Sequence, residues 1–369
     1  MMNIRHFLYA CMACLCSAVL ASCEHRILTD PTDVHYVRVY LDEEIKNVNC
    51  GFYNESYEHP DFFRPANMRA ALADAQTGEI LYEGLLRNQG NDEKGNYLDG
   101  YLSAPAGDYH ILMYQLGSPV TLIRHHDTYF DMTAYTNPVN DRAMTYLPQI
   151  GNAIDREKIM GEPEHILASR CESIHISHSS GVDTLRTSSG EYFTAHTIAK
   201  SYYLQLKIIG VEWVRAAGAV LSGMAGSSML CKENGMVEDD PVHLFFSMTY
   251  ADKKKRAGEE ASIATLYTTF TTFGKIPDIS SELTLNFEFT KNDGTTQTAT
   301  FDITEAFKTP LAVEKQWILL DEVVTITKPE NTEEGIRESK DGKMKTPTYL
   351  CKLKNTTINI NNYILIYSL

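Results

Sequence analysis

Two histidine clusters in this chain have residue types that could bind a metal or move a proton. His125-His126-Asp127 offers two imidazoles and a carboxylate, and His175 and His178 have the spacing of one helical turn. The segment with His175 and His178 alternates as a strand, in which residues at an odd offset point to opposite faces, and adjacent residues such as His125 and His126 would also point to opposite faces on a strand. Neither pair of rings can then meet one ion without a bend in the chain. We therefore expect an ordinary polar loop at residues 125–127 and no metal shared by His175 and His178.

A nucleophile or nucleotide site is not indicated either. Gly223–Ser228 is rich in small residues, but it follows an expected strand and lacks the helical pattern of a nucleophile elbow. The chain has no Walker loop, dinucleotide fingerprint or EF-hand loop. The sequence contains 48 carboxylates, so naming any two as acid and base would be arbitrary. The basic run Lys253–Arg256 is a solvated loop or a protease-sensitive site. We expect a protein that is not an enzyme and has no cofactor and no metal.

Cys23 carries the clearest chemical signal. It follows a positive residue, Arg5, and an apolar segment at residues 7–20 that is shorter than the about 20 residues needed to span a bilayer. Such a segment is typical of a signal peptide. Leu20-Ala21-Ser22-Cys23 resembles a bacterial lipoprotein box, in which cleavage between Ser22 and Cys23 leaves a cysteine that takes acyl chains such as palmitate. The alternative is a secreted protein whose first mature residues happen to include a cysteine.

Charge and composition agree with an exported protein. The formal net charge is −15 at pH 7, which argues against nucleic acid as a partner and against a polybasic membrane patch. A length of 369 residues suggests two domains. Tyrosine is abundant (21) and tryptophan scarce (2), a bias that suits strands.

Four cysteines remain in the expected mature chain beyond the lipid site. They are too far apart for a C-x-x-C zinc or redox motif and allow three disulfide pairings, while unpaired buried thiols are equally compatible with their scatter. These cysteines are Cys50, Cys171, Cys231 and Cys351.

Alternation with a period of two predicts strands along the chain. Residues 34–41 have one apolar face, and 66–75 and 79–86 flank a turn at Gln76-Thr77-Gly78. Residues 283–290 and 296–303 flank an Asp293-Gly294 turn, a favoured hairpin pair. Further strands are expected at 97–103, 108–116, 173–177, 191–196, 202–211, 216–223, 242–250, 264–273 and 317–327. A short helix or irregular crossover is expected within 143–160.

These patterns predict an all-β protein with a β-sandwich or barrel in each half. We expect a signal peptide at 1–22, an N-terminal domain at 23–200, a C-terminal domain at 201–328, and a flexible linker with a strand-like tail at 329–369. The tail is charged and glycine-containing up to residue 345 and apolar from residue 356 onward.

Several segments together resemble the fimbrillin-like lipoproteins of Bacteroidales. The order of the lipoprotein box, a first strand and Ala104–Tyr114 (APAGDYHILMY) is similar to the first domain of that superfamily. Ala216–Leu230, which contains LSGMAG, Thr271–Gly274 and Phe301–Thr304 are similar to the second. The likeness covers residues 20–328 and is strongest to an uncharacterised branch with a domain of unknown function.

The resemblance implies two tandem transthyretin-like β-sandwich domains of Greek-key type and a role in type V pili or surface adhesion. In that system a protease removes the first strand after Arg or Lys, and the groove left behind accepts a strand from the next subunit. Here the strand removed would be residues 34–41, with Lys46 and Arg64 as cleavage candidates. Acids surround Lys46 and a proline follows Arg64, so we favour an uncleaved subunit.

The expected protein is thus a non-enzymatic lipoprotein of the outer membrane, lipid-anchored and facing the cell surface. We expect a pilus anchor, accessory or tip subunit, or an adhesin, that joins other subunits by strand addition. The apolar C-terminal tail would suit a donor strand, or it folds back on its own domain. Thr184 in Asp183-Thr184-Leu185 fits an O-glycosylation pattern of this phylum. The alternative is a lipoprotein that binds glycans or nutrients beside a transporter through Tyr53, Tyr57, Phe62 and Phe63.

Overall fold

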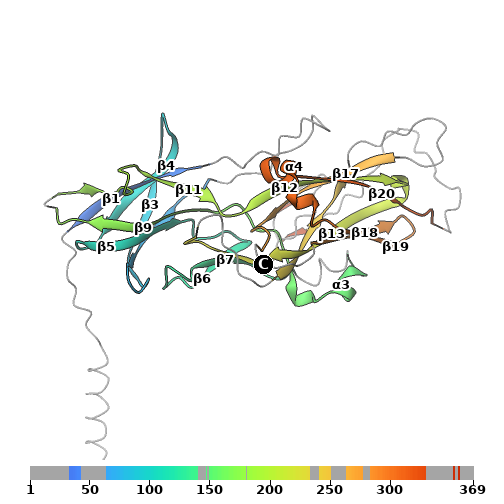
Figure 1. Ribbon diagram of the computed structural model, residues 1–369, viewed down its shortest axis with the longest axis horizontal. Helices are drawn as coiled ribbons and strands as arrows, with labels where there is room; N and C mark the ends of the chain where they lie inside the picture. Colours follow the sequence, from blue (N-terminus) through green and yellow to red (C-terminus); the bar gives the residue numbers. More distant parts are fainter. Residues whose placement is uncertain are drawn as a thin grey trace, which may run out of the picture.

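The computed structural model is an elongated, all-β molecule, as the alternation predicts (Figure 1). Strands from the first half of the sequence lie at one end and strands from the second half at the other. No helix among the described residues is long and apolar enough to cross a membrane. The structure describes residues 33–42, 64–139, 147, 149–179, 181–232, 241–250, 263–276, 283–329, 352–353 and 356–357.

The N-terminal half is one sheet that closes on itself. Its order is β10-β1-β11-β9-β5-β2-β3-β4, and β1 also pairs with β4, so seven strands form a barrel-like ring. Alternation predicts the strands but not this closure, because closure depends on which distant strands pair. The strands are β1 (Val34–Leu41), β2 (Met68–Asp74), β3 (Ile80–Asp92), β4 (Gly95–Ser103), β5 (Gly107–Tyr114), β9 (Leu167–Ile176), β10 (Asp183–Thr184) and β11 (Phe193–Thr197).

The C-terminal half consists of two sheets that face each other across one apolar core. The first has the order β16-β17-β12-β20 and the second the order β19-β18-β13-β15-β8. Leu206 of β12 and Phe287 of β18 are fully buried between them. The strands are β8 (Ile159–Met160), β12 (Lys200–Ile209), β13 (Val214–Ala225), β15 (Pro241–Ser247), β16 (Thr249–Tyr250), β17 (Ile263–Thr272), β18 (Thr284–Lys291), β19 (Thr296–Asp302) and β20 (Trp317–Thr325).

Residues 149–160 belong spatially to the C-terminal sheets although they precede β9 in the chain. They form α3 (Ile150–Ala153), the 3-10 turn η1 (Arg156–Lys158) and β8, which pairs in parallel with β15. This agrees with the short helix and crossover expected there. The carboxylate of Glu288 on β18 is fully buried and accepts hydrogen bonds from the backbone N–H groups of Gln149, at 3.2 Å, and Ile150, at 3.0 Å.

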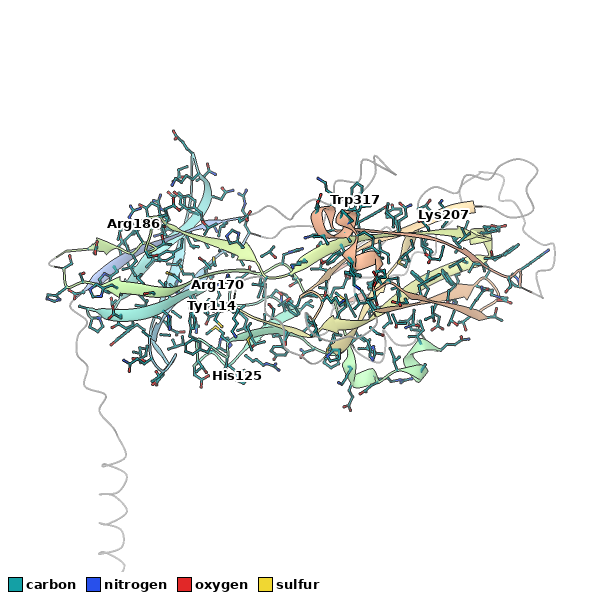
Figure 2. The ribbon with its side chains drawn as sticks, in the orientation of Figure 1. Tyr114, His125, Arg170, Arg186, Lys207 and Trp317 are labelled. Atoms are coloured by element: carbon teal, nitrogen blue, oxygen red, sulfur yellow. The ribbon has the colours of Figure 1, made fainter. Side chains whose placement is uncertain are left out.

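A third small sheet and a shared core join the two halves. β14 (Ser227–Met229), β7 (Thr133–Thr136) and β6 (Thr121–Arg124) pair in that order. The core beside them contains Ala71 and Tyr114 from one half and Leu230 and Phe273 from the other. Tyr114 lies on the side of the N-terminal half nearer the junction (Figure 2). The halves are therefore joined by buried surface as well as by the chain.

Local turn chemistry follows the sequence closely. Gly78 and Gly294 take φ values of 75° and 87°, which glycine adopts without steric cost, in the two turns predicted above. The helix α4 (Pro310–Lys315) was not expected, although Thr309 accepts a hydrogen bond from the N–H of Ala312 and proline opens its first turn. The remaining elements are the 3-10 turns η2 (Val211–Trp213) and η3 (Ala306–Lys308), and β21 (Lys352–Leu353) and β22 (Thr356–Thr357).

We predict that Glu288→Ala lowers the free energy of unfolding by about 2–4 kcal/mol, because it leaves the buried N–H of Ile150 without an acceptor and removes the partner of the Gln149 N–H. Urea unfolding measures the change. The matched control is Glu305→Ala, which breaks an exposed ion pair with Lys308 and should cost less than about 0.5 kcal/mol. Equal effects of the two substitutions would contradict the role given to Glu288.

Candidate functional site: the slot around β1

β1 is hydrogen-bonded along both of its edges. On one side Val34–Tyr40 pairs antiparallel with β4. On the other side its first part pairs in parallel with β10 and its last part in parallel with β11. Further bonds run from the N–H of Leu185 to the carbonyl of Tyr36 and from the N–H of Asp42 to the carbonyl of Ala195, both at 2.9 Å. β1 therefore fills a slot between distant parts of the chain.

The inner face of β1 is part of the N-terminal core. His35, Val37 and Val39 have no exposed surface, and the two valines pack with Leu98 of β4 and Phe193 of β11. Burying one such valine side chain contributes about 1.5–3 kcal/mol. This face confirms the apolar side predicted from the alternation of residues 34–41.

The outer face of β1 meets a complementary face of β4. Tyr36 stands opposite Tyr101, and Arg38 stands opposite Asp99. The Tyr36 hydroxyl donates to the Asp99 carboxylate at 2.6 Å, and the Arg38 Nε donates to the Tyr36 hydroxyl at 3.0 Å. Burial first, and then the bond to Asp99, raise the pKa of Tyr36 to about 12, so its hydroxyl remains a donor at neutral pH.

Asp92, at the end of β3, completes this arrangement. Its Oδ2 accepts from the Tyr40 hydroxyl at 2.8 Å and from Arg38 Nη1 at 3.1 Å. The bond from Tyr40 is the largest of the causes that lower the pKa of Asp92. The Arg38 guanidinium also lies 3.8 Å from the ring centroid of Tyr97 and 5.1 Å from that of Tyr192. We call this group the outer-face cluster: Tyr36, Arg38, Tyr40, Asp92, Tyr97, Asp99 and Tyr192.

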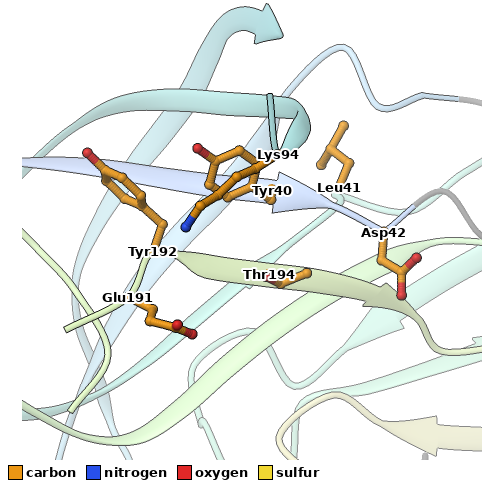
Figure 3. A pocket seen from close by; sticks show the side chains of 7 residues that line it. All are labelled: Tyr40, Leu41, Asp42, Lys94, Glu191, Tyr192 and Thr194. Carbon is orange, nitrogen blue, oxygen red and sulfur yellow. The ribbon is translucent and has the colours of Figure 1, made fainter. Parts of the chain in front are cut away.

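A hollow of about 360 Å³ opens at the end of β1 beside this cluster. Figure 3 shows the amine of Lys94 between the side chains of Tyr192 and Thr194. The guanidinium of Arg186, in the N-terminal half in Figure 2, lies 4.0 Å from the Tyr192 ring centroid. Because Arg186 already covers the Tyr192 ring and most of the lining is polar, the hollow suits a polar ligand group better than a ring stacked on tyrosine. The hollow is lined by Tyr40, Leu41, Asp42, Lys94, Glu191, Tyr192 and Thr194.

The remaining predicted histidine and cysteine sites are dispersed. His175 Nδ1 lies 2.7 Å from an Asp108 oxygen, and His178 Nδ1 lies 2.7 Å from an Asp33 oxygen, so the two rings have different partners. His125 takes a φ of 58° in its loop. Cys171 is a free thiol, and the buried Cys231 donates a hydrogen bond to the carbonyl of Phe130 at 3.4 Å. Within the described residues, no group of three His, Cys, Asp or Glu could hold a metal ion.

Two of the other predicted site residues lie in the described part of the chain. Arg64 is exposed and precedes the buried Pro65, and half-buried Thr184 lies on β10 opposite Tyr36. Thr184 stays a predicted acceptor for O-glycosylation. The following predicted residues lie outside the described part: Ser22, Cys23, Lys46, Cys50, Tyr53, Tyr57, Phe62, Phe63 and Cys351.

Sequence reasoning did not identify the partners of the outer face of β1. A signal was present, because Tyr97-Leu98-Asp99-Gly100-Tyr101 alternates Tyr-x-Asp-x-Tyr and Tyr36–Tyr40 alternates Tyr-x-Arg-x-Tyr. Opposite charges at the centre and tyrosines at both ends match in an antiparallel pair. The match becomes visible only when the register is known.

Comparison with known proteins finds fimbrial proteins among those that are similar to this chain. Residues 83–246 match the model of the Domain of unknown function (DUF5119). A candidate fimbrium anchoring subunit of Bacteroides ovatus is 25% identical over 230 residues, which is 58% of this chain. The resemblance to the fimbrillin-like proteins of Bacteroidales is confirmed. The aligned part of that relative is 63% of its length, less than two thirds.

One of the similar solved structures shows the same overall fold as this chain. The crystal structure of a candidate adhesin from Bacteroides ovatus superimposes with a TM-score of 0.54 at 20% identity, over 84% of this chain and 98% of that one. The fimbrial anchor protein Mfa2 from Porphyromonas gingivalis gives a TM-score of 0.45 at 12% identity, over 78% and 88%. The DUF5119 match begins within β3, so it includes Asp92 and Asp99 and leaves out β1.

We predict that Tyr36→Phe lowers the free energy of unfolding by about 1–2 kcal/mol, because it removes the donor to Asp99. Urea denaturation measures the change. Tyr101→Phe is the matched control on the opposite strand: this residue is 56% exposed, and the substitution should be nearly neutral. An equal loss in the two variants would mean that the bond from Tyr36 to Asp99 contributes no more stability than the exposed hydroxyl of Tyr101.

The lowered pKa of Asp92 predicts a pH dependence. A carboxyl group whose pKa is lower in the folded than in the unfolded state stabilises above its unfolded pKa, here 3.8, and this stabilisation is lost as pH falls through the folded pKa. The free energy of unfolding of the wild-type chain should therefore exceed that of Asp92→Asn by the largest amount at pH about 7 and by a smaller amount at pH about 3. Urea unfolding of both chains at the two pH values tests this. A difference that does not change with pH would show that the Asp92 charge is not involved.

Proposed function

We propose that the chain is a non-enzymatic surface lipoprotein, a fimbrillin-like pilus component of the anchor type, which keeps its first strand. The single observation that supports this role best is that β1 is bonded along both edges and packed on both faces. A subunit that accepts a strand from a neighbour must have this slot empty. The printed name of the Bacteroides ovatus relative, an anchoring subunit, supports the same role.

The finer parts of the proposal come from the sequence. Cys23 would carry the lipid that holds the mature chain to the outer membrane. The two halves would be tandem transthyretin-like domains of Greek-key type, at residues 23–200 and 201–328, with residues 149–160 of the first range packed on the second domain and the tail at 329–369 following. Contact with other pilus subunits would use β-strand addition, and the tail is the segment of this chain suited to donate a strand.

Binding of a glycan or nutrient beside a transporter is the alternative role. The hollow at the end of β1 supports it, because two tyrosines, Tyr40 and Tyr192, are among the residues that line it. Two contacts in the lining argue against glycan binding there. Arg186 already lies over the Tyr192 ring, and the Tyr40 hydroxyl already donates to Asp92. We therefore place this role second.

The mature N-terminus in the native outer membrane tests the anchor role. Intact-mass spectrometry should find an acylated Cys23 on essentially every copy, because the proposed role requires β1 to stay covalently attached. The control is a polymerising pilin from the same membrane, whose N-terminus should lie after its first strand. A new N-terminus of this chain between Asn47 and Pro65 would overturn the anchor role.

A further inference from the structure

The outer-face cluster recognises one specific side chain of β1, the guanidinium of Arg38. Asp92 lies 3.1 Å from it and Asp99 3.8 Å, and the ring of Tyr97 lies under it. Only 20% of the Arg38 side chain is exposed. An apolar residue in its place would leave both carboxylates without the cation that they share. The slot therefore distinguishes strands by a basic residue at this position.

The tyrosines two residues before and after Arg38 fix the position of β1 along the slot. Tyr36 donates to Asp99 and Tyr40 donates to Asp92, so each carboxylate receives one hydroxyl and shares the guanidinium. These outward residues recur every second position, while the buried valines fill the positions between them. A strand shifted by one residue would place its apolar residues outward and its charge inward.

We propose that the outer-face cluster is a specificity-determining latch that selects a strand of the pattern Tyr-x-basic-x-Tyr. It holds the chain's own β1 in the slot by non-covalent contacts, even when the backbone between β1 and β2 is cut. The inference rests on the proposed retention of β1 and adds which residues cause it. Proteolysis after Lys46 or Arg64 would then leave β1 in place.

The sequence of this chain contains a natural competitor for the slot. Tyr363-Ile364-Leu365-Ile366-Tyr367 repeats the tyrosine spacing and the β-branched inner positions of Tyr36-Val37-Arg38-Val39-Tyr40. Leu365 stands where β1 has Arg38. The isoleucines in the tail of a second copy would fit the apolar inner face of the slot. That tail has no arginine for Asp92 and Asp99, so the latch favours β1 over it.

A strand-exchange experiment tests the latch in the mature chain without its lipid. A specific protease site is inserted between residues 43 and 63, β1 carries a fluorescent label, and the site is cut. Circular dichroism confirms that the fold survives. Unlabelled peptides then compete for the slot, in urea below the unfolding transition so that exchange is measurable. Size-exclusion chromatography measures release of the labelled β1.

Four peptides separate the latch from simple apolar fit: residues 33–42, the same peptide with Arg38→Leu, residues 360–369, and that peptide with Leu365→Arg. The label should stay bound after the cut. The Arg38→Leu peptide should compete at least about tenfold less well than residues 33–42, and Leu365→Arg should improve the tail peptide by a similar factor. Equal competition by all four would overturn the latch.

Variants of the slot provide the second readout. In a chain with Asp92→Asn and Asp99→Asn, the preference for arginine over leucine should collapse. The matched control is Asp108→Asn, whose carboxylate pairs with His175 outside the cluster, and it should leave the preference unchanged. Release of β1 on cutting, with the fold intact, would also overturn the latch. The anchor role is tested separately by the native N-terminus, so the two proposals can fail independently.

Discussion

The pairing of β1 with strands far away in the sequence is the constraint on which the N-terminal half depends. β4 on one side and β10 and β11 on the other would each present unpaired N–H and C=O groups without it, and the ring would be open. Leu98 and Phe193 would also lose the valines that cover them. One short strand therefore supplies both the closure of the sheet and part of its core.

The chemistry of the outer face gives this strand its register. Valines on the inner face would tolerate a shift of two residues, because the apolar pattern repeats. Arg38 between Asp92 and Asp99 does not repeat, and each tyrosine hydroxyl has its own carboxylate. Partly buried charged hydrogen bonds are stronger than neutral ones and need specific geometry. Apolar burial thus provides most of the stability, and the polar cluster provides the register.

Local sequence patterns predicted most strands and turns, whereas the order in which the strands pair depends on tertiary contacts that no local pattern shows. Alternation located most of the strands, and the glycines at 78 and 294 marked their turns correctly. The sequence could not show that residues 149–160 join the C-terminal sheet, because their partners, the strand β15 and the buried carboxylate of Glu288, lie much later in the chain. The cluster around Arg38 was missed for the same reason. Its halves lie on different strands, and nothing local to either specifies the partner.

If Cys23 carries the proposed lipid anchor, the closed ring would resist force applied through the N-terminus. The segment that would lead to Cys23 leaves β1 at its first residue, so a pull between membrane and pilus acts along the strand. Backbone bonds to β4, β10 and β11 run across that direction and are loaded together rather than one at a time. The contacts of Arg38 resist the same sliding motion, because a shift along the strand separates it from both carboxylates. A strand held in this way suits a subunit that bears load through its N-terminus, whereas a strand meant to be exchanged would need a weaker outer face.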